Sequence, residues 1–284
     1  MKSREEVLQT LRDLKTLPSL PEVAAKVLEL SNDSEVSPKS ISDTVEKDPA
    51  IATRLLKLVN SPYYGIRGTM TSVQQSVIFL GVSNLRNLVL STSVLDLFDQ
   101  EVRVGSFSIK ELWVHSLATA CAARELCKEL RLADPEVAFS AGLIHDIGKI
   151  VMDQHMHEDF QRVVSLMDRH NASMLDAETA VLGVDHAEIG YFLASRWSLP
   201  EVLQETIGFH HAPARATNHK QIAALVGYAD HVVRTLKLGN GGGESPALAA
   251  DFSVVLPLED GKLEEFTENI EESLREQVQS LEAL

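Results

Sequence analysis

The sequence predicts an all-α protein, and three observations support that prediction. Apolar residues recur at intervals of three and four along most of the chain, whereas the strict alternation of a strand is almost absent. Prolines stand near the starts of the apolar segments, where their fixed φ and missing N–H donor suit a first helical turn. With 44% hydrophobic and 24% charged residues over 284 positions, the composition is that of a globular protein with a substantial core.

Helical spacing gives the expected elements in chain order. The first segments are 21–31 and 49–59, and Asn60-Ser61-Pro62 followed by Tyr63-Tyr64-Gly65 ends the second of them. The next expected helices cover 72–80, 83–98, 108–130, 134–154, 157–170, 172–182, 185–197, 199–211 and 219–237. A last amphipathic helix is expected over about 259–282.

Two interruptions divide these helices into three parts. The irregular stretch 99–105 separates a first third without histidine from the part that holds all ten histidines. The run Gly239–Pro246 is too rich in glycine for a helix and indicates an exposed loop or linker. We therefore expect an N-terminal helical subdomain over 1–105, a second subdomain over 106–238 that shares its core, and a flexible loop with an acidic helix over 239–284.

Charge and apolar content limit the partners and the compartment. A formal charge of −15 argues against binding to nucleic acid or to an anionic membrane surface. Four cations of the first subdomain could form a small basic patch, but they alternate with apolar core positions, so no nucleic-acid partner is expected; they are Arg54, Lys57, Arg67 and Arg86. The N-terminus lacks the apolar core of a signal peptide and no apolar stretch approaches membrane-spanning length. We expect a cytoplasmic protein without a membrane partner.

The two cysteines, Cys121 and Cys127, lie six residues apart on one expected helix and so on poorly matched faces. They are expected to be reduced packing residues and not a redox pair. From Asp251 to Leu284, ten acidic residues stand against Lys262 and Arg275, a net charge of −8. This acidic helix is either a solvated face or a contact surface for a partner. The segment 84–98 has the same two interpretations.

The run His145-Asp146-Ile147-Gly148-Lys149 indicates a metal site. Its candidate partners are His115, His186, His210, His211 and Asp230. Imidazole nitrogens together with a carboxylate that can bridge two cations suit Zn, Mn, Fe or Ni rather than Mg or Ca. On one helix, His145, Asp146 and Lys149 would project to one side, with the ammonium close to the metal. That arrangement fits metal-assisted phosphoryl chemistry, with Asp146 and Lys149 as the catalytic candidates.

Each histidine also has a plainer interpretation. His115, on an apolar helix, could be a hydrogen-bonded core residue, and His186 could merely follow the N-cap candidate Asp185. His210 and His211 could interact with a helix C-terminus. The remaining histidines look like surface residues or, for the last, point away from the site: His155, His157, His170, His219 and His231.

The order of these residues resembles the HD superfamily of helical metal-dependent phosphohydrolases, and in its two-metal arrangement the HD-GYP branch. Four segments of the first third resemble more narrowly the HDOD family, the HD-related output domain of bacterial signalling proteins. They are Leu17-Pro18-Ser19-Leu20-Pro21, Lys47-Asp48-Pro49-Ala50, Leu58-Val59-Asn60-Ser61-Pro62 and Ser76-Val77-Ile78-Phe79-Leu80-Gly81. The resemblance covers about residues 10–235.

The resemblance implies a two-metal site on an HD-like helical fold. One ion would be held by His115, His145, Asp146 and Asp230, and the other by His186, His210 and His211, with Asp146 bridging. Iron or manganese is favoured, and zinc or nickel also fits. After His211, Ala212-Pro213-Ala214-Arg215 stands where the HD-GYP branch carries a glutamate and then its Gly-Tyr-Pro loop, so cyclic di-GMP is not the expected substrate.

Two functions follow from the resemblance. The first is a regulatory signal-transduction module with a retained two-metal site, a signalling protein as partner and a phosphorylated small molecule as a further ligand. The alternative is an active metal-dependent phosphohydrolase acting on a nucleotide or another phosphoester. The complete ligand set favours the enzyme. The resemblance to the HDOD family favours the module, because many members of that family are non-catalytic.

Overall fold

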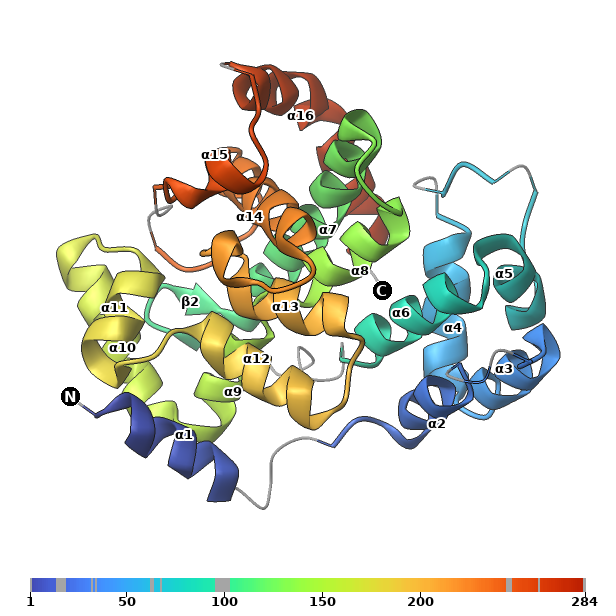
Figure 1. Cartoon of the computed structure of the whole chain (residues 1–284), viewed down its shortest axis with the longest axis horizontal. Helices are drawn as coiled ribbons and strands as arrows, with labels where there is room; N and C mark the ends of the chain where they lie inside the picture. Colours follow the sequence, from blue (N-terminus) through green and yellow to red (C-terminus); the bar gives the residue numbers. More distant parts are fainter. Residues whose placement is uncertain are drawn as a thin grey trace.

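The computed structural model describes residues 2–13, 19–31, 33, 35–61, 64–66, 68–94, 103–243, 247–259 and 261–282. Over these ranges the protein is built of packed helices, as predicted (Figure 1). The one sheet of the described residues is a minimal antiparallel hairpin of β1 (Arg103–Val104) and β2 (Phe107–Ser108). Leu17, Pro18, Pro62, Tyr63, Arg67, the stretch 95–102 and the loop residues 244–246 lie outside the described residues.

The helices α2 to α6 form one group, at the right of Figure 1. They are α2 (Glu22–Leu30), α3 (Pro38–Val45), α4 (Pro49–Val59), α5 (Val73–Leu80) and α6 (Val82–Ser93). The Asp48 carboxylate caps α4 by accepting from the N–H groups of Ala50 and Ile51 at 2.9 and 3.1 Å. Asn60 ends that helix, and its side chain exchanges two hydrogen bonds with the backbone of Met70. The expected turn therefore follows α4.

A second group of helices surrounds the long central helix α7 (Ile109–Leu130), which packs against α8, α14 and α16. Helix α12 packs in turn against α9 and α13. The members are α8 (Pro135–Ile144), α9 (Ile147–His155), α10 (His157–His170), α11 (Met174–Leu182), α12 (His186–Arg196), α13 (Glu201–Phe209), the 3-10 turn η3 (Pro213–Arg215), α14 (Lys220–Thr235), α15 (Asp251–Val255) and α16 (Lys262–Leu281). Every candidate metal ligand lies in this group.

The two groups meet where α6 packs against α8. Ser91 of α6 donates to the Ser140 carbonyl of α8 at 3.2 Å, and Tyr64 donates to the Glu136 carboxylate at 2.6 Å. The first helix, α1 (Arg4–Asp13), lies instead beside the second group (Figure 1). Its approach is held by an ion pair of Lys2 with Asp159 at 2.5 Å and by one of Arg4 with Glu188. The boundary placed at residue 105 stays a prediction, and α1 is spatially a neighbour of later helices.

Two local expectations were wrong. The helix expected over 134–154 is interrupted, because α8 ends at Ile144 and α9 begins at Ile147, with His145 and Asp146 between them. The described part of the expected exposed linker, residues 239–243, is packed, because Gly241 and Gly242 are buried and Gly243 forms a β-bridge with Ser173. Both cysteines are free and buried, as predicted. Within the described ranges, no helix combines the length and the apolar character that crossing a membrane requires.

Replacing Gly148 by alanine should destabilise the fold. A Cβ at this position would collide with the backbone carbonyl of His186 and approach the Gly190 nitrogen at 2.9 Å, so α9 and α12 would have to separate. We expect Gly148→Ala to lower the free energy of unfolding by about 2–3 kcal/mol in urea titrations. As a control, a Cβ at Gly208 meets the half-exposed side chain of Tyr191 and no backbone atom among its nearest neighbours, so Gly208→Ala should cost less stability than Gly148→Ala. Equal losses in both variants would contradict this packing argument.

Candidate metal centre

The interruption between α8 and α9 positions the centre of the site. His145 follows the last residue of α8, and Asp146 precedes the first residue of α9. The expectation that His145, Asp146 and Lys149 share one continuous helix was therefore wrong. Lys149 nevertheless returns to Asp146, because it lies in the first turn of α9 and its Nζ reaches Asp146 Oδ2 at 2.5 Å. The sharp turn aims the imidazole and the carboxylate into the same buried space.

The other predicted ligands arrive from four further helices. His115 lies on α7, His186 opens α12, His210 and His211 follow the last residue of α13, and Asp230 lies on α14. Asp185 caps α12 as expected, accepting from the Glu188 N–H at 2.8 Å. A Cβ at Gly227 of α14 would collide with the His210 carbonyl, so glycine is needed there for α13 to end against α14. All seven predicted ligand residues thus lie around one centre.

Within this centre the donors fall into two groups. The first consists of His115, His145 and Asp146, and the second of His186, His210 and His211; in each, the donor atoms lie within 4.8 Å of one another. Oδ2 of Asp146 faces the first group, 3.5 Å from His115 Nε2 and 3.3 Å from His145 Nε2. Oδ1 faces the second, 3.1 Å from His186 Nε2. The carboxylate of Asp146 therefore stands between two sets of nitrogen donors.

Hydrogen bonds on the outer side of the rings set the tautomers. Nδ1–H of His145 donates to the Gly142 carbonyl at 2.7 Å, and Nδ1–H of His210 donates to the Ile207 carbonyl at 2.9 Å. His186 donates through Nδ1 to the Glu178 carboxylate at 2.6 Å. A neutral imidazole that donates through Nδ1 presents the lone pair of Nε2, here toward the centre. These three rings are oriented as metal ligands are.

Several buried donor atoms of the centre have no hydrogen-bond partner among the described residues. They are Nε2 of His145 and His210 and Oδ1 of Asp146, whereas Nε2 of His115 lies 2.9 Å from Asp230 Oδ1. Leaving such atoms unsatisfied costs about 1–3 kcal/mol each. Cations bound at the two donor groups would satisfy these atoms, so the donor set fits metal ions.

Electrostatics favour the ligating protonation states of Asp146, His115 and His210, whereas neighbouring carboxylates outweigh burial and raise the pKa values of His145 and His186. Burial alone would raise the pKa of Asp146, but the neighbouring His145, Lys149 and His186 outweigh it and hold that pKa well below its usual value. Burial lowers the pKa of His115 to about 4 and holds that of His210 well below the ordinary value. Burial also opposes a proton on His145, but the carboxylates of Asp146 and Asp230 raise its pKa to about 9. The site attracts positive charge, which a metal ion supplies in place of that proton.

Comparison with known proteins identifies the fold and the family. The family model of the HDOD domain matches residues 17–213. The chain belongs to the HDOD family. A protein of Treponema pallidum (strain Nichols), itself without a characterised function, is 30% identical over 241 residues, 81% of this chain and 44% of its own length. This chain thus spans less than half of that relative.

Two solved structures are similar over almost the whole HDOD chain. A Geobacter sulfurreducens HDOD domain protein of unknown function has a TM-score of 0.79 at 26% identity and covers 98% of this chain and 96% of its own. A Shewanella amazonensis protein, named provisionally as a phosphohydrolase, has a TM-score of 0.70 at 25% identity and covers 96% and 97%. Both similar structures thus have the helical fold of this chain.

Two charged residues of the site were missed from the sequence. Glu178, fully buried on α11, orients His186, and no spacing rule links these residues across the turn at Gly183. Arg234 lies one helical turn after Asp230 and donates through Nε to Asp230 Oδ1 at 2.8 Å. This pair, four residues apart on a helix, could have been recognised. The family match ends before both Asp230 and Arg234.

The glycine run, expected as a linker, forms one wall of the site. The Gly241 carbonyl accepts from Lys149 Nζ at 2.6 Å and from the guanidinium of Arg234 at 3.3 Å. The Gly242 carbonyl accepts a second bond from Arg234, also at 3.3 Å. Residues 239–243, which we call the strap, are thus packed against Lys149 and Arg234.

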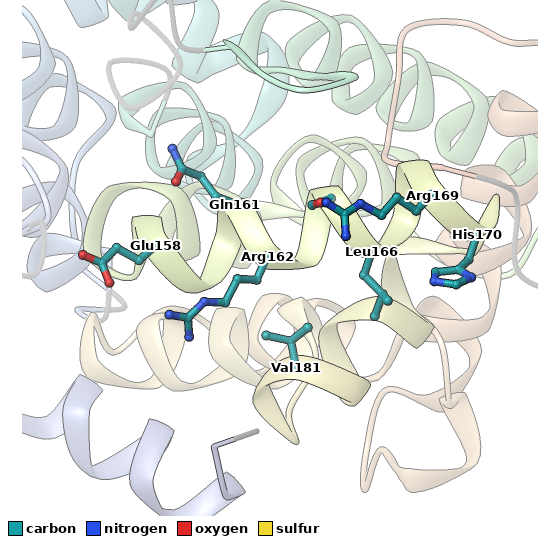
Figure 2. A pocket seen from close by; sticks show the side chains of 8 residues that line it. Glu158, Gln161, Arg162, Leu166, Arg169, His170 and Val181 are labelled. Carbon is teal, nitrogen blue, oxygen red and sulfur yellow. The ribbon is translucent and has the colours of Figure 1, made fainter.

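The remaining histidines stay outside the two donor groups. His157 and His170 are exposed, and His155 and His219 are half-buried. His231, also half-buried, borders a small pocket beside Asp230. A separate open groove of about 750 Å³ runs along α10, where Arg162, Arg169 and His170 line it (Figure 2). It shares no residue with the candidate metal centre.

Replacing Glu178 by alanine should weaken metal binding without removing a ligand. The variant loses the acceptor that sets the tautomer and orientation of His186, and such losses typically cost about 10–100-fold in metal affinity. Competition of Mn²⁺ or Zn²⁺ against a chelating dye measures the change. The matched control is Glu188→Ala, on the outer side of α12, which should bind as the wild type does. An unchanged affinity in Glu178→Ala would contradict the role given to this carboxylate.

Proposed function

We propose that the protein is a regulatory HDOD module whose HD-type site holds two divalent transition-metal ions but is closed to large substrates. The observation that carries the proposal is the burial of the site. The side chains of His145, Asp146, Lys149 and His210 are all 0% exposed. The pocket that reaches the ligands His211 and Asp230 has a volume of only about 100 Å³.

That volume supports the module over the enzyme. Pockets that enclose a small-molecule ligand usually measure about 300–1,000 Å³, so the space beside His211 suits water molecules or a small oxyanion and not a nucleotide. A hydrolase needs its substrate against the metal ions, whereas a regulatory module needs only the bound ions and the conformation they stabilise. Closure of the site therefore favours the module.

Two ions would fit the donor arrangement, with Asp146 bridging them. His115, His145 and Asp230 supply donors on one side and His186, His210 and His211 on the other. Iron and manganese match this mixture of imidazole and carboxylate, and zinc or nickel also fits. Because the ligands come from α7, the α8–α9 turn, α12, α13 and α14, metal binding would hold five parts of the fold together. The ions would then act as structural or sensing elements.

Phosphohydrolase activity is the second candidate, favoured by the position of Lys149. When bound, the metal ions would lower the pKa of a water molecule and polarise a phosphoryl oxygen. Lys149, beside Asp146, is placed to orient phosphate oxygens. The Shewanella relative carries a phosphohydrolase name. The turn at Pro213–Arg215 replaces the Gly-Tyr-Pro loop, so cyclic di-GMP remains disfavoured as a substrate.

The partner of such a module would be another signalling protein. Beyond the domain, the Treponema relative is longer than this chain, and a signal passed between domains or chains is consistent with that architecture. The acidic helix α16 and the exposed Ile78 and Phe79 of α5 are surfaces on which contact with a protein could occur. Nothing about the charge of the chain favours nucleic acid or a membrane as partner.

Elemental analysis tests the metal assignment. Protein purified without added metal should carry two transition-metal ions per chain, and Asp146→Ala should lose both because its two oxygens face the two donor groups. His211→Ala should lose one ion, and the exposed His170→Ala should lose none. Plasma mass spectrometry on matched preparations gives the stoichiometry. Protein that neither retains nor rebinds metal would refute the assignment.

A panel of phosphoesters separates the module from the enzyme. Supplied with Mn²⁺ or Fe²⁺, the wild type should turn over nucleotides and other phosphoesters no faster than Asp146→Ala does. Release of inorganic phosphate is the measurement. Turnover by the wild type that disappears in Asp146→Ala would establish the hydrolase instead, and turnover that survives in Asp146→Ala would exclude this site as its source.

A further inference from the structure

The strap, residues 239–243, meets the site through two cationic side chains. Lys149 is 0% exposed, and its Nζ contacts Asp146 Oδ2 on one side and the Gly241 carbonyl on the other. Arg234 donates through Nε to Asp230 and through its two terminal nitrogens to the carbonyls of Gly241 and Gly242. Two cations beside the metal ligands thus point their remaining N–H groups at backbone oxygens.

These carbonyl oxygens stand where the oxygens of an anion could stand. An ammonium and a guanidinium that converge within hydrogen-bonding distance of one group are typical of phosphate recognition. Backbone carbonyls carry only partial negative charge, so they are weaker partners for Lys149 and Arg234 than phosphate oxygens would be. The strap carbonyls therefore occupy the position of an anion without carrying the negative charge of an anion.

The construction of the strap is specific. Gly239, Gly242 and Gly243 all have positive φ, at +67°, +101° and +64°, which side chains rarely adopt. A Cβ at Gly241 would approach His115 Nε2 at 2.8 Å. Asn240 holds the turn together, since its Oδ1 accepts from the Gly242 N–H at 2.8 Å and its Nδ2 donates to the Ser106 carbonyl at 3.3 Å.

On its outer side the strap borders a second hollow. A surface pocket of about 380 Å³ is lined by Asn240 and Gly243 of the strap together with Ser106, Asp168 and Asn171. The strap therefore separates a hollow of ligand size from a buried cationic site. If it withdrew, the two spaces would join.

We propose that the strap is an autoinhibitory cover, whose Gly241 and Gly242 carbonyls occupy the phosphoryl-oxyanion site of Lys149 and Arg234 until an oxyanion ligand displaces them. This inference deepens the proposed function by naming how the site is regulated, and it relies on that function only for the metal ions beside Lys149. The strap must be lifted before the anion can bind. The apparent affinity for the anion is therefore the intrinsic affinity multiplied by the fraction of molecules in which the strap is lifted.

Loosening the strap from outside the site should expose the cationic pair. Asn240→Ala removes the bonds to Gly242 and Ser106 and leaves every metal ligand, Lys149 and Arg234 in place. Measured by calorimetry at constant ionic strength, this variant should bind inorganic phosphate at least about tenfold more tightly than the wild type. The control Asn84→Ala removes a surface bond to Asp134 and should bind as the wild type does. Equal phosphate affinity in wild type and Asn240→Ala, or binding in neither, would overturn the proposal.

A double variant assigns the binding to Lys149. Asn240→Ala/Lys149→Gln should lose the gain in phosphate affinity, and a gain that persists would place the anion elsewhere and overturn the proposal. Metal content measured on the same samples keeps the two hypotheses apart. Absence of metal would refute the two-metal site alone. The phosphate affinities test separately whether the strap covers the oxyanion site.

Hydrogen–deuterium exchange tests the movement directly and needs no substitution. Saturating phosphate should accelerate exchange in wild-type peptides that span 239–243, because the Asn240 N–H loses its partner, the Glu111 carbonyl of α7, when the strap withdraws. Peptides from α8 should not change. Phosphate that binds to the wild type without altering exchange in the strap would refute the covering role.

Discussion

The buried carboxylate of Asp146 is the constraint on which the rest of the site depends. It is fully enclosed, and a charge without partners in that position would cost several kcal/mol. The protein surrounds it with Lys149 at 2.5 Å and with imidazole nitrogens on both of its oxygens. The break between α8 and α9 lies at this residue and turns its side chain toward the interior. Helices that arrive around it, α7, α12, α13 and α14, are those that carry the remaining donors.

Close backbone approach makes this convergence compatible with a packed core. Gly148 lies against the His186 carbonyl and Gly227 against the His210 carbonyl, in both cases nearer than any side chain would permit. The outer partners of the rings, such as the Gly142 carbonyl and Glu178, belong to the same helices or to their neighbours. Orientation of the ligands is therefore a property of helix packing. Metal binding and folding stability should be linked through it.

The proposed regulatory function is consistent with membership in the HDOD family and with the burial of the candidate ligands. Hydrolysis would require both the metal ligands and access of a substrate to them, and under our proposal residues 239–243 block that access. An enclosed two-metal site would still stabilise one arrangement of five parts of the fold. The strap connects that arrangement to the surface, because it touches Lys149 and Arg234 on its inner side and a hollow on its outer side.

Helical periodicity and proline positions predicted the all-α fold, and the HDIGK run with its partners predicted the seven residues that lie around the candidate centre, because these signals are local or occur in a recognisable order. The family was predicted from the resemblance of four segments in the first third. Tertiary structure decided the rest. The break at His145-Asp146 accompanies the burial of a carboxylate, and no helix propensity of the local sequence predicts it. Glu178 joins the site across the turn at Gly183, and the strap joins it through the contact of Gly241 with Lys149, which lies 92 positions earlier. The glycines of the strap indicated a loop or linker in the sequence, but only packing determined that this loop forms a wall of the site.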